Sequence, residues 1–309
     1  MLAKLLVPLD RSPLAAQAVG PAVSIARAAR AALDLVVVHE PFPFGGFRDI
    51  PWNGDDGSDD LKYIEAVAAE VRSGASVPVT SAVLHGAPAE MICARARDVG
   101  ADLIVMTSHG RTGLSRAWLG SVADAVVRHS AIPVLLLRPI EKPADLVGAT
   151  PAFKRMLVLL DGSALAADII PTATQLAQAS GATIVLLRIV PFVPLLANLQ
   201  PEMPLATLPL VPDDDATQRL EETVRSELEG VAERLRETSH LTVETHVVVN
   251  VNTAEAIIDF ARGHHIDVIA MSTHGRGASR VLLGSIADKM LRASGLPVLV
   301  RRPEGVGAE

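Results

Sequence analysis

The chain has few aromatic residues, a single cysteine and no long hydrophobic run. Aromatics make up 3% of its 309 residues while hydrophobic residues make up 49%, so the core must consist of aliphatic side chains. Cys93 alone excludes an intrachain disulfide and is typical of a reducing compartment; we expect it to be buried on a helix. No run reaches the roughly 20 apolar residues of a membrane-spanning helix, and Pro8 and Asp10 interrupt the first apolar run. We therefore expect a soluble, cytoplasmic protein without a membrane partner.

Basic surface and catalytic motifs are also scarce. The formal net charge of −7 argues against wholesale attraction to nucleic acid. The chain contains no Gly-x-Ser-x-Gly elbow, no His-Glu-x-x-His motif and no Gly-Lys-Ser/Thr phosphate loop. His264 and His265 have no companion at metal-ligand spacing, and we expect them at an exposed helix end. We therefore assign no catalytic residue and no metal site.

The chain repeats itself at a period of about 165 residues, which is the length of a domain rather than of a solenoid unit. Residues 102–139 read DLIVMTSHGRTGLSRAWLGSVADAVVRHSAIPVLLLRP, and residues 267–303 read DVIAMSTHGRGASRVLLGSIADKMLRASGLPVLVRRP. The repeat predicts one domain over residues 1–139, a linker over 140–152 and a second domain over 153–309.

Each half alternates apolar runs with helical patterns. The runs predict strands at 5–9, 33–39, 77–84, 102–108 and 133–139, and again at 156–161, 183–190, 241–249, 267–273 and 297–303. Helices are expected at 13–31, 60–74, 88–99 and 121–129, and again at 164–179, 216–238, 253–262 and 285–293. Ser12 is expected to cap the helix at 13–31, and Asp215 to cap the helix at 216–238. Continuously apolar strands are covered on both faces, which is typical of parallel sheets. We expect an α/β protein with two tandem five-stranded, doubly wound parallel domains.

Ligands of such sheets bind beyond the carboxyl ends of the strands. Asp10, Glu40 and Gly86 follow the first three strands, and the stretch from Thr107 to Ser121 follows the fourth. Its glycines and the helix start at Ser121 predict a phosphate cradle, because glycine admits a close phosphate and a helix start offers free N–H groups. Ser121 with Asp124 also fits a simple helix cap, with no ligand at all.

These residues resemble the universal stress protein family. The resemblance rests on VPLDRS at 7–12 and MTSHGRTGLSRAWLGS at 106–121, and it covers both halves outside the central loops and the linker. The nucleotide-binding branch of that family has Gly, two residues, Gly, nine residues and then Gly-Ser or Gly-Thr. Gly110 and Gly120-Ser121 fit this pattern, whereas Thr107 replaces the leading glycine.

The resemblance implies a Rossmann-like domain, of the adenine nucleotide alpha hydrolase-like type, that binds ATP with Mg²⁺. It implies that Asp10 lies near the base or ribose, and that Pro8 and Met106 flank the base. The residues it places at the phosphates and ribose are Thr107, Gly110, Gly120, Ser121 and Val122. Arg111 fits either a phosphate contact or a surface position.

The second half departs further from the family pattern. Its corresponding residues are Asp161, Ser272, Gly275, Gly284, Ser285 and Ile286. Only eight residues separate its two glycines, and one residue fewer moves backbone donors by up to about 3.5 Å, more than the length of a hydrogen bond. We therefore expect tighter nucleotide binding in the first half.

Three functions remain open at this point: a nucleotide-binding regulatory or sensor module, a slow ATP hydrolase, and a nucleotide-free scaffold. Asp124 and Asp288 are the acids nearest to the expected phosphates, although their first-turn position also suits helix capping. The last strands, at 133–139 and 297–303, are apolar sheet edges that invite pairing. We expect the two halves to pair through them as a pseudo-twofold unit, and the sequence leaves a homodimer open.

Overall fold

The computed structural model describes residues 1–40, 57–108, 119–138, 153–192, 213–274 and 283–303. The first half contains β1 (Lys4–Leu9), α1 (Pro13–Ala16), α2 (Val19–Ala29), β2 (Ala32–His39), α3 (Ser58–Gly74), β3 (Val79–His85), α4 (Pro88–Asp98), β4 (Leu103–Thr107), α5 (Ser121–His129) and β5 (Val134–Leu137). The second half contains β6 (Arg155–Leu159), α6 (Ala164–Ala167), α7 (Ile170–Ser180), β7 (Thr183–Val190), α8 (Asp214–Ser239), β8 (Val243–Val249), α9 (Thr253–Gly263), β9 (Val268–Ser272), α10 (Ser285–Ala293) and β10 (Val298–Arg301).

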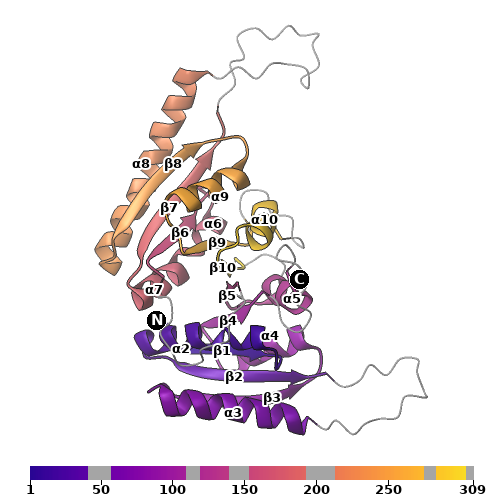
Figure 1. The fold of residues 1–309 in the computed structure, drawn as a ribbon. Helices are drawn as coiled ribbons and strands as arrows, with labels where there is room; N and C mark the ends of the chain where they lie inside the picture. The colour runs from indigo at the N-terminus through magenta and orange to yellow at the C-terminus, as the bar shows by residue number, and fades with distance from the viewer. Residues whose placement is uncertain (41–56, 109–118, 139–152, 193–212, 275–282, 304–309) are drawn as a thin grey trace, which may run out of the picture.

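The strands of both halves join into one ten-stranded sheet. Its order is β3-β2-β1-β4-β5-β10-β9-β6-β7-β8, and all pairs are parallel except the central one. β5 and β10 pair antiparallel, with Leu135 opposite Leu299. The two halves therefore lie one above the other and meet at these short strands (Figure 1). This confirms the predicted doubly wound halves and their pairing through the last strands.

Each face of the sheet carries a hydrophobic core that runs through both halves. Side chains alternate along β1, so that Leu5 and Val7 enter one core and Leu6 enters the other. Helices α2, α3, α7 and α8 cover the first core, while α4, α5, α9 and α10 cover the second. Helix α2 also packs directly against α7 across the junction. The halves thus share two continuous cores.

The first helical segment of each half is broken where the sequence predicted one helix. The predicted helix at 13–31 divides into α1 and α2, and that at 164–179 divides into α6 and α7. Pro21 and Pro171 lie in the first turns of α2 and α7, where a missing N–H is tolerated. A helix continuing through these prolines would lose a hydrogen bond and clash, so it restarts instead.

Two expectations about helix ends need correction. Asp213, rather than Asp215, caps α8: the Ala216 N–H donates to its Oδ1 at 2.9 Å, and the helix begins before the predicted residue 216. His265 is exposed just after α9, as expected, whereas His264 is half-buried and its ring stacks on that of Phe260 with centroids 3.8 Å apart. In contrast, Ser12 and Ser163 cap α1 and α6 through their hydroxyl oxygens, and Ser12 does so as predicted.

Candidate functional site

The loop after β1 presents Asp10 at the carboxyl end of the sheet. The Ser12 backbone N–H donates to Asp10 Oδ1 at 2.9 Å, and the Ala15 N–H donates to Ser12 Oγ at 3.0 Å. Asp10 and Ser12 therefore form one hydrogen-bonded turn that leads into α1. Pro8 is buried two residues before Asp10, within the strand. An ionised carboxyl can accept about four hydrogen bonds, so this side chain suits a site that binds hydrogen-bond donors.

The fourth strand brings its end to the same edge. β1 and β4 are parallel neighbours, and continuing their register places Met106 beside Pro8. Met106 and Thr107 are buried at the end of β4. The Gly120 N–H donates to the Ser108 carbonyl at 2.8 Å, which brings the start of α5 back to the end of β4. The structure thus gathers Pro8, Asp10, Met106, Thr107 and Gly120; Gly110 and Arg111 lie outside the described residues.

Helix α5 begins without a side-chain cap. Gly120 is the N-cap residue, and Ser121 is the exposed first residue of the helix rather than its cap, which corrects the expected capping role. Val122 follows it, half-buried against the core. The first N–H groups of a helix have no partner within the helix and favour negative charge. This helix start therefore offers donors at the same edge of the sheet as Asp10.

The second half repeats the arrangement with different local contacts. Asp161 Oδ1 accepts from the Ser163 N–H at 2.8 Å and from the Ser163 hydroxyl at 2.6 Å. The buried Ser272 donates to the Ala166 carbonyl at 3.4 Å. Gly284 caps α10 without a side chain, so Ser285 and Ile286 open that helix. Gly275 lies outside the described residues.

Gly284 is glycine because of a close backbone approach rather than a special φ. Its φ is −58°, which is open to any residue, but a Cβ there would lie 2.9 Å from the Thr273 carbonyl oxygen. The Gly284 N–H donates to that same oxygen at 2.9 Å. Thr273 is itself buried, with Oγ1 hydrogen-bonded to His274 Nδ1 at 2.9 Å. Gly120 makes the equivalent contact to Ser108 in the first half.

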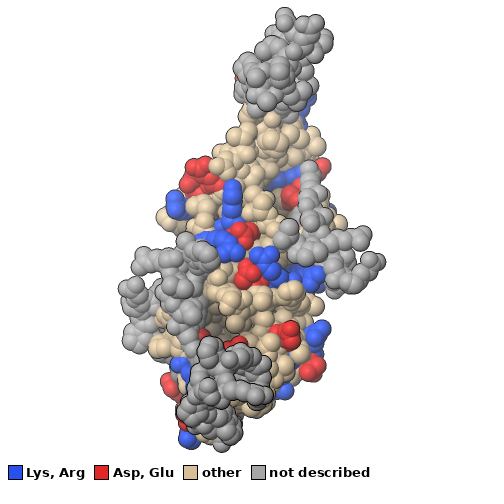
Figure 2. Space-filling model, turned by 90° about the vertical axis from the view of Figure 1, so that its right-hand side faces the viewer, with Lys and Arg blue, Asp and Glu red and all other residues tan. Residues whose placement is uncertain are grey.

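The first-turn acids of α5 and α10 belong to the junction between the halves. Arg128 donates to Asp124 from Nε and Nη2 at 2.7 and 3.1 Å, and Arg292 of the other half reaches the same carboxylate at 3.3 Å. Arg292 also pairs with Asp288 at 2.9 Å. Helix capping alone therefore does not describe these two acids, because their carboxylates also pair with arginines at the junction. Figure 2 shows charged side chains of both signs gathered near the middle of this face.

Arginines after the last strands complete this junction. Arg302 donates to the Arg128 carbonyl at the end of α5, at 3.2 Å, and Arg138 donates to the Leu291 carbonyl of α10. Each half thus binds the last turn of the other half's helix. Burial lowers the pKa of the Arg138 guanidinium.

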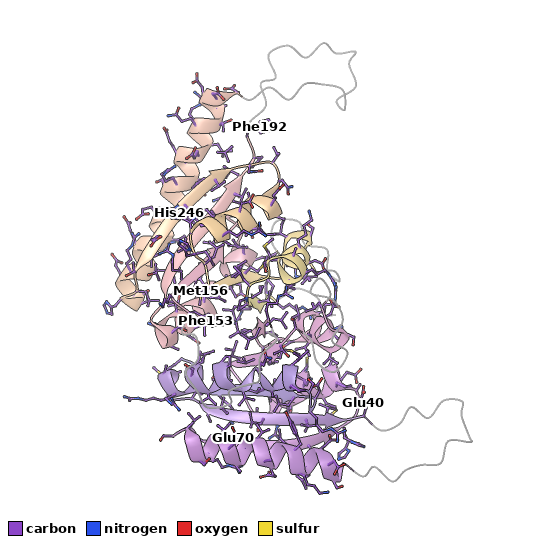
Figure 3. The ribbon with its side chains drawn as sticks, in the orientation of Figure 1. Glu40, Glu70, Phe153, Met156, Phe192 and His246 are labelled. Carbon is purple, nitrogen blue, oxygen red and sulfur yellow. The ribbon has the colours of Figure 1, made fainter. Side chains whose placement is uncertain are left out.

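Sequence reasoning missed a polar cluster on the α3 side of the first site. Asp60 is buried at the start of α3, where His39 Nδ1 lies 2.8 Å from Oδ2 and Arg11 Nε lies 3.1 Å from Oδ1. The hydroxyl of Tyr63 is buried nearby without a hydrogen-bond partner among the described residues. Burial raises the pKa of this phenol, and the charge of Asp10 raises it further. Glu40 follows β2 at the same end of the sheet (Figure 3).

The second half has an arginine where the first has an aliphatic residue. Arg188 interrupts the apolar strand β7, is buried, and pairs with Glu227 at 2.7 Å. A charge inside the run TIVLLRIV was the visible signal in the sequence.

Among the described residues there is no group of three or more His, Cys, Asp or Glu that could hold a metal ion. No helix in that part of the chain is long and apolar enough to cross a membrane.

Comparison with known proteins identifies this arrangement. The model of the universal stress protein family matches residues 1–138 and again residues 152–302. The chain belongs to the universal stress protein family. A universal stress protein of Mycobacterium tuberculosis is 25% identical over 253 residues, covering 81% of this chain and 78% of that protein. One from Methanocaldococcus jannaschii is 32% identical over 149 residues, covering 45% of this chain and 84% of its own length.

Solved universal stress proteins share the fold over the whole chain. One from Archaeoglobus fulgidus superposes with a TM-score of 0.66 at 20% identity, covering 97% of this chain and 98% of that one. A second, from Pseudomonas aeruginosa UCBPP-PA14, gives a TM-score of 0.65 at 19% identity, covering 99% and 95%. This chain is thus a tandem universal stress protein with both repeats in one sheet.

Proposed function

We propose that this universal stress protein binds ATP or a related adenine nucleotide, with Mg²⁺, as a regulatory or sensor module. The site in the first half consists of Pro8, Asp10, Met106, Thr107, Gly110, Arg111, Gly120, Ser121 and Val122. The site in the second half consists of Asp161, Ser272, Gly275, Gly284, Ser285 and Ile286. The two sites lie in one chain whose halves pair through β5 and β10.

One observation carries this proposal: in both halves an uncapped helix start returns to the end of a strand, at the same edge of the sheet as an aspartate that follows the neighbouring strand. Gly120 and Gly284 each donate to a carbonyl just after β4 and β9, and neither α5 nor α10 has a side-chain cap. Phosphate oxygens suit such N–H groups because they accept hydrogen bonds and carry negative charge. Asp10 and Asp161, at the adjoining strand ends, suit hydroxyl or amino donors at the other end of a nucleotide.

The hydrolase alternative is weaker because the nearest acids are engaged. Asp124 is held by Arg128 and Arg292, and Asp288 by Arg292, so neither is poised to accept a proton from water. Kinases, which have a positioned base, turn over at about 1–100 s⁻¹. We expect any ATP turnover here to lie far below that range.

The function is tested by calorimetry with ATP and Mg²⁺ on the full chain and on a matched pair, Asp10→Asn and Asp161→Asn. Asparagine keeps an oxygen that can accept from the N–H of Ser12 or Ser163, so the turns survive while the charge is lost. Losing a hydrogen bond to a charged group, about 1.5–3 kcal/mol, weakens a site roughly tenfold or more. Asp10→Asn should weaken the tighter site; if Asp161→Asn does so instead, the ranking of the sites is wrong.

The domain boundaries and the location belong to the same proposal. We place the boundary in the linker at 140–152, between the two stretches that match the family, with domains at 1–139 and 153–309. The single cysteine supports a cytoplasmic location, because disulfides are rare in reducing compartments. We propose no nucleic-acid or membrane partner.

A further inference from the structure

The loop that carries the aspartate has the same unusual backbone in both halves. Arg11, directly after Asp10, has a φ of 67°, and Gly162, directly after Asp161, has a φ of 83°. Glycine adopts this left-handed region freely, whereas an L side chain there is unfavourable by roughly 1–2 kcal/mol. The first half therefore needs a contact that holds Arg11 in place, and the second half does not.

Asp60 supplies this contact in the first half. Its side chain is 4% exposed, and its two oxygens face Arg11 Nε at 3.1 Å and His39 Nδ1 at 2.8 Å. The Arg11 N–H does not point at Oδ1, so this contact is an ion pair rather than an aligned hydrogen bond. Asp60 lies in the first turn of α3, where negative charge is also favourable. The loop of Asp10 is thus attached to α3 and to the end of β2.

The second half brings an acid and an arginine to the same loop from other positions. Arg188 comes from β7, and a Cβ on Gly162 would lie 2.5 Å from its Nη2. The side chain of Arg188 is 10% exposed and pairs with Glu227 of α8. Helix α8 corresponds to α3, because both follow the second strand of their half. An arginine therefore lies against the loop in each half, although neither the arginine nor the acid has an equivalent position.

We propose that Asp60 is a positioning residue of the nucleotide site in the first half, holding the loop of Asp10 through the Arg11 guanidinium. This inference rests on the proposed function, which requires Asp10 and the start of α5 to face one ligand. A loop that leaves the left-handed conformation at Arg11 carries Asp10 away from that ligand and reduces the competent population.

The test compares ATP affinity in the full chain with four variants. Asp60→Asn removes the charge that holds Arg11, and affinity at the first site should fall about 5- to 30-fold, the factor corresponding to a left-handed penalty of about 1–2 kcal/mol. Arg11→Gly should keep its affinity, because glycine needs no holding at this φ. The double variant Asp60→Asn with Arg11→Gly should recover it. Asp59→Asn is the matched control, since Asp59 is exposed and pairs only with Lys62 among the described residues.

The double variant decides between positioning and direct contact. If Arg11→Gly loses as much affinity as Asp60→Asn, the guanidinium binds the ligand itself and the proposal is overturned. Failure of the double variant to recover affinity, or an unchanged affinity in Asp60→Asn, overturns it as well.

A second readout does not require nucleotide. Amide exchange of Ser12 and Ala15, whose N–H groups are bonded within this turn, should speed up in Asp60→Asn and not in Asp59→Asn. If the wild type binds no nucleotide while exchange still speeds up in Asp60→Asn and not in Asp59→Asn, the proposed function alone is contradicted.

Discussion

At the scale of single residues, the glycines at the starts of α5 and α10 have a role that the sequence conceals. Their φ values, −60° and −58°, predict tolerance of any side chain. The approach of Gly284 to the Thr273 carbonyl forbids it in the second half, since a Cβ would need the backbone to move. The sequence alone does not distinguish a glycine required by a close backbone contact from a glycine required by a bound phosphate.

Replacing Gly284 with alanine should therefore destabilise the protein even without ligand. Forcing a methyl group into a packed site typically costs about 1–3 kcal/mol of unfolding free energy. Gly230→Ala is the matched control, because this glycine lies inside α8 and, among the described residues, a Cβ there would meet only Arg234, at 3.8 Å. It should stabilise by about 0.5–1 kcal/mol. Urea denaturation measures both changes, and a neutral Gly284→Ala would show that the loop yields freely.

Other residues show what the sequence can and cannot reveal. Ser12 was predicted as a cap because a cap is local, and Cys93 lies half-buried on α4, where burial raises the pKa of its thiol. Asp60 lies 49 residues from Arg11 in the chain, but its Oδ1 lies 3.1 Å from Arg11 Nε in the structure. Its role depends on tertiary packing, and no local pattern marks it.

At the scale of elements, the pattern of apolar residues predicted the positions of the strands well, but it did not predict where the helices break. Strands such as β4, which lies within the predicted range 102–108, are short continuous apolar runs of the kind that parallel strands buried on both faces show. The divisions between α1 and α2 and between α6 and α7 were missed because alanine-rich sequence favours an unbroken helix. The prolines that force the breaks lie in the first turn of the second helix, where proline is also compatible with a helix start.

The contact between β8 and α9 should make stability depend on pH. The His246 ring lies 5.0 Å from that of Phe260 and 5.1 Å from that of His264, with Glu244 and Arg155 close by (Figure 3). Burial lowers the pKa of His246 from its usual 6.5, and His264 lowers it further. Unfolded chains then bind more protons than folded ones between the lowered pKa and 6.5.

The unfolding free energy should thus be highest above a pH of about 6.5 and fall as the pH drops through the lowered pKa of His246. Urea titrations on both sides of this window measure the change. His246→Gln should flatten the dependence, whereas His129→Gln, at the exposed end of α5, should leave it intact. Equal slopes in the wild type and His246→Gln would assign the effect to another group.

At the scale of the whole molecule, the internal repeat predicted two domains, and the structure joins them more closely than a linker requires. Both cores cross the junction, and β5, β10, α2 and α7 all contribute to it. The sequence indicated the pairing strands because apolar edges need cover. The crossed contacts of Arg138 and Arg302 could not be foreseen, because they depend on the pseudo-twofold arrangement itself.

We therefore expect the two halves to move and unfold together. NMR relaxation should give one rotational correlation time for both halves, and denaturation followed at probes in each half should give coincident transitions. The shared cores provide the physical reason, since separating the halves would expose apolar side chains of both. Two correlation times, or two separate transitions, would show that the halves are independent domains.

The central claim is adenine-nucleotide binding, and the most direct test is to identify the released ligand. The purified chain is incubated with ATP and Mg²⁺, freed of unbound nucleotide by gel filtration, denatured and analysed by mass spectrometry. We predict that adenine nucleotide is recovered from the wild type and that Asp10→Asn retains less of it than Asp161→Asn. Wild-type protein that releases no adenine nucleotide would contradict the account and leave the chain as a nucleotide-free scaffold.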